Sequence, residues 1–91
     1  MFTDPQTITV ADLVVGDFVV SYPRQANVPA RDVRSTVETI SEHWDRWAHQ
    51  AAPRRPKFPI PSRVATFVSR DVRALDLPTD CVVVVRRPVQ P

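Results

Sequence analysis

The stretch TVADLVVGDFVV, residues 9–20, decides the fold that this sequence predicts. Thr9 and Asp12 have the spacing of a capping box, in which side chains bond the free backbone N–H groups at the start of a helix. Gly16 predicts the end of that helical turn, because glycine takes a positive φ at little cost. The apolar run after it predicts a strand at 18–22. Alternation along this strand places three side chains on one face: Phe18, Val20 and Tyr22.

Gly16 is also the only glycine in 91 residues, which excludes several common catalytic motifs. A P-loop, a dinucleotide-binding turn and a G-x-S-x-G nucleophile elbow each need at least two glycines. His43 and His49 are six residues apart, so one helix face would not present both to a metal ion. Cys81, the only cysteine, begins an apolar run, where thiols are usually inert core groups. We therefore predict a protein that is not an enzyme, with no catalytic residue, no cofactor and no metal site.

Runs of apolar and β-branched residues predict further strands at 63–69 and 81–86. The second run is apolar at five successive positions, which predicts an interior strand with both faces covered. An irregular link at 71–77 should join the two strands. Within it, Leu75 and Leu77 are expected to close one end of the core.

Residues 33–52 satisfy two different patterns. Val37 and Ile40 belong to a set of apolar residues at helical spacing, which favours a helix. The segment 35–41 is rich in β-branched residues and poor in helix formers, which favours a strand. Sequence signals alone slightly favour the helix and leave the strand open. Four prolines in the region that follows predict an extended loop at 51–62.

Segment 11–20 resembles the opening of many small SH3-like β-barrels, in which a turn ending in Val-Gly-Asp leads into the first barrel strand. The rest of the chain resembles small, mostly uncharacterised proteins of actinobacterial phages. That resemblance lies in YPRQ at 22–25, STVETI at 35–40 and VVRRP at 84–88. It implies that residues 34–42 form a strand, and it transfers no functional residue.

The resemblance implies a mainly β fold, either a small SH3-like barrel or a rolled antiparallel sheet of about five strands. A short helical turn, and at most one short helix near 43–51, would accompany the strands. The length predicts that residues 1–91 form a single domain. Loose tails are expected at 1–6 and 88–91.

The formal net charge of +2 is unevenly distributed along the chain. Residues 1–45 hold three arginines against seven carboxylates, whereas residues 46–91 hold nine basic residues against three aspartates. A basic half can attract nucleic acid or an acidic protein face. We favour the alternative that the halves neutralise each other across one fold, because asymmetry along a sequence is not asymmetry in space.

Aromatic and basic side chains are interleaved between residues 44 and 63. Such a segment can contact a protein, where Trp and Arg are common hot spots, or it can stack on bases while its charges hold phosphates. In a third interpretation the tryptophans belong to the core. The small net charge favours a protein partner over nucleic acid. The candidate partner-binding residues are Trp44, Arg46, Trp47, Arg54, Arg55, Lys57, Phe58 and Arg63.

The sequence therefore predicts a non-enzymatic interaction module, and the resemblance implies a bacteriophage accessory protein that binds a host or phage protein. A nucleic-acid-binding protein and a virion or oligomer subunit are the alternatives. The single cysteine, and Asp4 and Pro5 where a signal peptide would be basic and apolar, predict a cytoplasmic protein. For a phage protein, as the resemblance implies, this is the host cytoplasm. The apolar run at 81–85 is far shorter than the roughly 20 residues that span a bilayer, so no membrane partner is expected.

Overall fold

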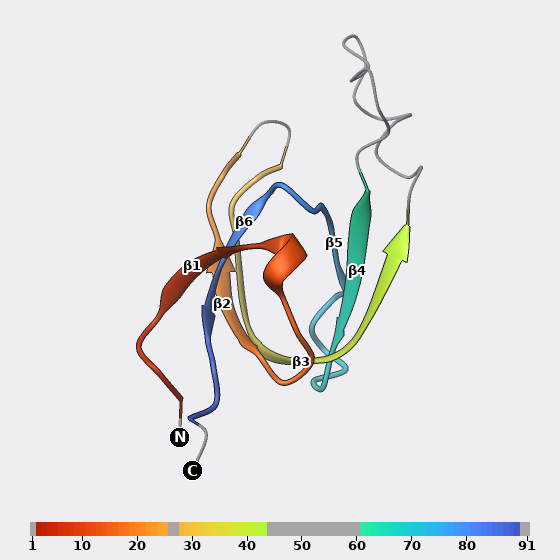
Figure 1. The fold of residues 1–91 in the computed structure, drawn as a ribbon. Coiled ribbons are helices and arrows are strands. Elements are labelled where there is room, and N and C mark those ends of the chain that lie inside the picture. Colours follow the sequence, from red (N-terminus) through yellow and green to blue (C-terminus); the bar gives the residue numbers. More distant parts are fainter. Residues whose placement is uncertain (1, 26–27, 44–60, 90–91) are drawn as a thin grey trace, which may run out of the picture.

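The computed structural model describes residues 2–25, 28–43 and 61–89, and their strands form one antiparallel sheet (Figure 1). The order is β1-β6-β2-β3-β4-β5, and the sheet is open because β1 and β5 are its edges. The prediction of a mainly β fold is confirmed, with six strands described where about five were expected. The elements are β1 Gln6–Thr9, the 3-10 turn η1 Val10–Asp12, β2 Phe18–Tyr22, β3 Arg31–His43, β4 Ser62–Phe67, β5 Leu75–Pro78 and β6 Val82–Arg86.

β3 is the long strand that joins the two halves of the sheet. β2 pairs with its first part, 31–36, and β4 pairs with its second part, 37–43. Glu38 is an extra residue relative to β4, and a bulge of this kind lets a strand bend as β3 does in Figure 1. The strand implied at 34–42 is therefore confirmed. Pairing with β2 along the first part and with β4 along the second gives the backbone of β3 hydrogen-bond partners on both neighbouring strands.

A bulge in β2 corrects the face predicted for this strand. Val20 is an extra residue relative to β6, so the alternation of the strand shifts at this point. Val19 and Tyr22 are buried, whereas Phe18 and Val20 are only partly buried and lie on the other face. The prediction that Phe18, Val20 and Tyr22 share one face is therefore wrong for Tyr22. A bulge is defined by the register between strands, so it could not be detected from the alternation of residues within β2.

The core lies between the two halves of the bent sheet, and η1 packs against it (Figure 1). The prediction that Leu75 and Leu77 belong to the core is confirmed, since both are buried. η1 is tied to the start of β6 by a hydrogen bond from the Val10 N–H to the Cys81 carbonyl (2.8 Å). Among the described residues, the apolar ones with no exposed surface are Val10, Leu13, Val19, Ala65, Leu75, Val83 and Val85.

The turn before β2 differs in detail from the predicted helix end. The Thr9 hydroxyl donates to the Asp12 carboxylate (3.2 Å) and accepts no hydrogen bond from a backbone N–H, so the capping box is not formed. Gly16 has the expected positive φ of 98°, but it lies in the turn that follows η1 and not at the end of a helix. The buried Asp17 carboxylate accepts a hydrogen bond from the Val14 N–H (3.0 Å) and so fixes this turn.

The loose tails predicted at 1–6 and 88–91 are wrong for the described residues there. Phe2 forms an antiparallel bridge with Pro88, and β1 begins at Gln6. Pairing with β1 on one side and β2 on the other makes β6 an interior strand, as predicted. β1 was missed because its sequence, QTIT, contains a single apolar residue and gives no strand signal of its own.

Part of the link predicted to be irregular at 71–77 is a strand. β5 pairs with β4 and places Leu75 and Leu77 on the core side, two residues apart as the period of a strand requires. The helix considered near 43–51 lies outside the described residues beyond its first position. The extended loop predicted at 51–62 likewise lies outside them, except for its last two residues.

Candidate functional site

Seven of the eight predicted partner-binding residues lie outside the described part of the chain, so their assignment stays a prediction. They are Trp44, Arg46, Trp47, Arg54, Arg55, Lys57 and Phe58. The eighth, Arg63, lies in β4 and can be examined directly.

Arg63 is bound within the protein. Its Nη1 group lies 3.0 Å from the carbonyl oxygens of both Val10 and Ala11, and 2.8 Å from that of Leu13. Its Nε lies 3.5 Å from a carboxylate oxygen of Glu42, and the Arg63 side chain is 17% exposed. The carbonyls at the end of a helical turn have no partner within the turn. Arg63 supplies that partner for Ala11 and Leu13, and it is a second donor to the Val10 carbonyl, which also accepts the Leu13 N–H. The sequence did not indicate this structural role.

A line of side chains crosses the face of the sheet that is turned away from the core. Phe18 of β2 faces Arg86 of β6 on one side and Thr36 of β3 on the other. Val68, directly after β4, continues the line by donating its N–H to the Thr36 carbonyl (2.9 Å). The ring of Phe2 packs against that of Phe18, with 5.6 Å between centroids. We call these five residues the outer row.

Three of the five side chains of the outer row are apolar, and the row is open to solvent at both ends. Phe2 is 38% exposed and Val68 is 61% exposed, while Phe18 between them is partly buried. Antiparallel sheets that cover a core with one face usually carry polar side chains on the other. Aromatic and branched side chains at these positions are typical of a surface that contacts another molecule.

Two adjacent arginines at the end of β6 are used differently. The Arg87 Nε lies 3.3 Å from the carboxylate of buried Asp17, and its Nη2 donates to the Asp12 carbonyl (2.9 Å). Arg86, in the outer row, donates from Nε to the Thr3 carbonyl (2.8 Å). Its two Nη groups have no partner among the described residues. The outer row therefore carries one guanidinium that is held in place but not neutralised.

Two further valines extend the exposed apolar surface close to the outer row. Val14 is 53% exposed and Val15 is 61% exposed, both in the turn before β2. The Gly16 N–H donates to the Val37 carbonyl (3.0 Å), which ties this turn to β3 beside Thr36. In Figure 1 the turn lies at the same lower end of the molecule as the end of β4.

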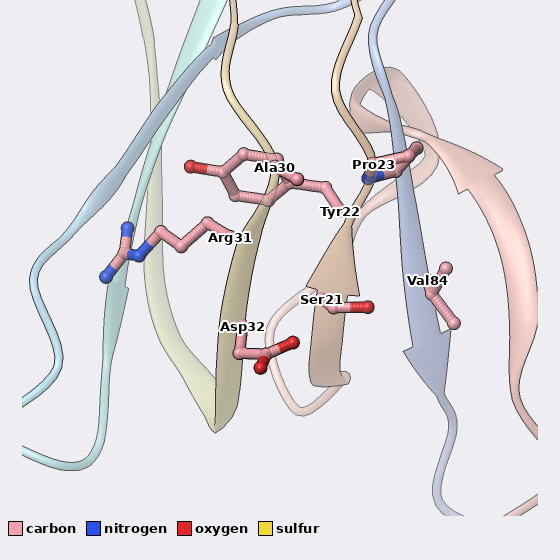
Figure 2. Close-up of a pocket in the computed structure, with 7 residues that line it drawn as sticks. All are labelled: Ser21, Tyr22, Pro23, Ala30, Arg31, Asp32 and Val84. Atoms are coloured by element: carbon pink, nitrogen blue, oxygen red, sulfur yellow. The ribbon is translucent and has the colours of Figure 1, made fainter.

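A shallow hollow of about 390 Å³ lies further along β2 and β3 (Figure 2). Ser21 faces Asp32 of β3 and Val84 of β6. In Figure 2 the Arg31 side chain points away from Val84, and its Nη2 donates to the Arg73 carbonyl (2.6 Å). Among the described residues, no histidine, cysteine or lysine lines the hollow, and the titratable group that faces Ser21 is the Asp32 carboxylate. The lining residues are Ser21, Tyr22, Pro23, Ala30, Arg31, Asp32 and Val84.

The groups considered for metal or thiol chemistry have ordinary surroundings. Burial raises the pKa of the Cys81 thiol, and the negative charge of Asp80 raises this pKa further. A raised pKa keeps the thiol protonated and unreactive at neutral pH. His43 lies with its Nε2 3.3 Å from the Ser41 hydroxyl, and His49 lies outside the described residues. The described segments contain no group of three His, Cys, Asp or Glu residues that could hold a metal ion.

Comparisons with protein-family models, with curated proteins and with solved structures find no match to this chain. The resemblance to SH3-like barrels and to phage proteins therefore stays a prediction. Within residues 2–25, 28–43 and 61–89, no helix has the length and apolar character needed to cross a membrane. The candidate site rests on the geometry of the outer row.

Sequence reasoning did not identify the outer row, because its members come from strands distant in the sequence. One signal pointed toward it. The apolar run at 81–85 has apolar residues on both faces of β6, and we interpreted this as a strand covered on both sides. The structure places Val83 and Val85 in the core and leaves Val82 and Val84 partly exposed on the outer face.

Proposed function

We propose that this chain is a non-enzymatic interaction module that binds a protein partner through the outer row. The observation that carries the proposal is the aromatic pair Phe2–Phe18 in line with Arg86 and Val68 on the solvent-facing side of the sheet. Aromatic residues and arginine are enriched where proteins contact one another. A partner that covers Phe2 and Val68 would remove their exposed apolar surface from water, which favours binding.

We also propose that the module is a bacteriophage accessory protein acting in the host cytoplasm. This part rests on the resemblance of 22–25, 35–40 and 84–88 to phage proteins. The aromatic and basic segment between residues 44 and 63 remains a second proposed contact region. Arg63 is the exception, because its guanidinium already binds η1.

Affinity capture with matched variants tests the outer row. Tagged wild-type protein, Val68→Asp and Ala30→Asp would be expressed in the cells that carry the gene, and the retained proteins would be quantified after nuclease treatment. Both variants exchange an exposed apolar side chain for an acidic one, but Ala30 lines the hollow and precedes Thr36 by six residues. Because six residues of strand span about 20 Å, Ala30 lies well away from Thr36 in the outer row.

We expect a partner that wild type and Ala30→Asp retain and that Val68→Asp loses. Equal recovery by all three proteins would contradict the proposal. Loss with Ala30→Asp alone would place the contact at the hollow instead. Circular dichroism of each variant would verify that the sheet has formed before the recoveries are compared.

A further inference from the structure

We infer that the occupant of the outer row is an extended segment of the partner that presents one carboxylate followed by two apolar side chains. This inference rests on the proposed function and specifies the chemistry of the partner. Arg86 would pair with the carboxylate. Phe18 with Thr36, and then Val68, would receive the apolar side chains.

Arg86 is oriented for such a pairing. Its Nε is held by the Thr3 carbonyl (2.8 Å), and Phe18 faces it from the adjacent strand. This fixes the side chain and leaves both Nη groups without a partner in the described segments. Two parallel N–H groups of a guanidinium match the two oxygens of a carboxylate. Neighbouring Arg87 offers no such site, because its Nε and Nη2 already face Asp17 and Asp12.

The spacing along the outer row sets the spacing in the partner. Arg86, Phe18, Thr36 and Val68 lie on or directly after four adjacent strands, β6, β2, β3 and β4. Three intervals between strands of about 4.8 Å give roughly 14 Å from the first to the last. An extended peptide covers this distance in about four residues, and residues i, i+2 and i+4 lie on one side of it. The expected pattern is therefore acidic-x-apolar-x-apolar.

A protein segment fits the outer row better than nucleic acid does. Arg86 is its only cation, whereas a groove that follows a phosphate backbone carries positive charge along its length. The half of the row beyond Phe18 consists of Thr36 and Val68 and offers no positive charge to a phosphate. In β3, the exposed residues Asp32 and Arg34 add one charge of each sign, so this strand does not make the outer row more basic.

Titration of ¹⁵N-labelled protein followed by NMR tests the inference. The probes are the peptide Ac-Asp-Ser-Leu-Ser-Leu-NH2, its analogue with Asn in place of Asp, and a ten-residue oligothymidylate at low salt. We expect the acidic peptide to shift the backbone amides of Phe18, Thr36, Val68 and Arg86. Its affinity should exceed that of the Asn analogue by about three- to tenfold, the range for a partly exposed charge pair.

Arg86→Gln should remove the preference for the acidic peptide, and the exposed control Arg24→Gln should keep it. Comparing the affinities of the Asp and Asn peptides for the wild-type protein also tests the role of the carboxylate, and this comparison does not depend on whether a variant folds. Equal affinity of these two peptides, shifts outside the outer row, or no binding would overturn the inference. So would a response of the outer row to the oligonucleotide alone.

The two proposals can fail separately. Binding of both peptides to the outer row with equal affinity would overturn the acidic pattern and leave the interaction module standing. Capture of a partner that does not depend on Val68 would instead overturn the proposed function and the inference together.

Discussion

Two of the described residues have a positive φ, and they differ in how well their side chains suit it. Gly16 has a φ of 98° in the turn before β2, and Arg34 has a φ of 54° within β3. Residues Val33 and Arg34 together face the single residue Val20 of β2, so Arg34 lies in a bulge of the kind where glycine is common. A side chain in the left-handed region costs about 1–3 kcal/mol. Arg34 therefore reduces the stability of the fold, and Gly16 avoids that cost.

Replacing Gly16 with alanine and Arg34 with glycine should change the free energy of unfolding in opposite directions. Gly16→Ala should lower the free energy of unfolding by about 1–2 kcal/mol. A Cβ at Gly16 would meet nothing within 4 Å, so this loss comes from the backbone alone. Arg34→Gly should raise the free energy of unfolding by up to about 1 kcal/mol, since glycine also loses more entropy on folding. Urea unfolding followed by circular dichroism measures both, and unchanged or reversed midpoints would contradict this account.

Cys81 should make stability depend on pH in the alkaline range. Its thiol has a raised pKa in the folded chain, from burial first and from Asp80 second. Above the ordinary thiol pKa of about 8.5, the unfolded chain therefore holds fewer protons than the folded one, and the free energy of unfolding falls as pH rises. Cys81→Ala should lack this part of the decline between pH 8 and 10. If the free energy of unfolding falls equally with pH in wild type and in Cys81→Ala across that range, the pKa of the thiol is not raised by folding.

At the scale of elements, Arg63 connects β4 to η1, and its loss should loosen η1 selectively. Arg63→Lys keeps the charge but cannot reproduce the planar group that reaches the Val10, Ala11 and Leu13 carbonyls. We expect a loss of about 1–3 kcal/mol in the free energy of unfolding, typical of hydrogen bonds to a charged group. Arg24→Lys, at an exposed position, is the matched control and should change little.

Hydrogen exchange distinguishes this role of Arg63 from a general effect on the sheet. In Arg63→Lys the Val10 and Leu13 amides, which bond to Cys81 and to Val10, should exchange faster, while amides within β6 change less. Uniformly faster exchange throughout the sheet would contradict a local role for Arg63.

The strands that could be predicted are those with a local signal. The apolar run of β6, the Gly-Asp start of β2 and the alternation in β4 each mark a strand in the sequence itself. β1 and β5 were missed because neither has a long apolar run, and each is a strand only because β6 or β4 offers it a free edge. The bulges at Val20 and Glu38 were missed for a related reason: they are defined by the register between strands.

At the scale of the whole molecule, the bent sheet explains where a contact surface can lie. Core residues fill the space between its halves, so the face turned away from the core is the part of the sheet available to a partner. The outer row could not be predicted because it joins Phe2, Phe18, Thr36, Val68 and Arg86 across segments up to 84 residues apart in number. The predicted segment between residues 44 and 63 has the composition of a contact surface, and its described member, Arg63, is used inside the protein.

The most direct test of the account is site-specific crosslinking from the outer row. A photoreactive benzoylphenylalanine would be placed at Val68 in one variant and at the exposed Ala30 in another, and both would be irradiated in the cells that carry the gene. The account predicts a discrete protein adduct from position 68 that Arg86→Gln weakens and that position 30 does not give. An adduct from position 30 alone, or none from position 68, would contradict the assignment of the outer row as the binding surface.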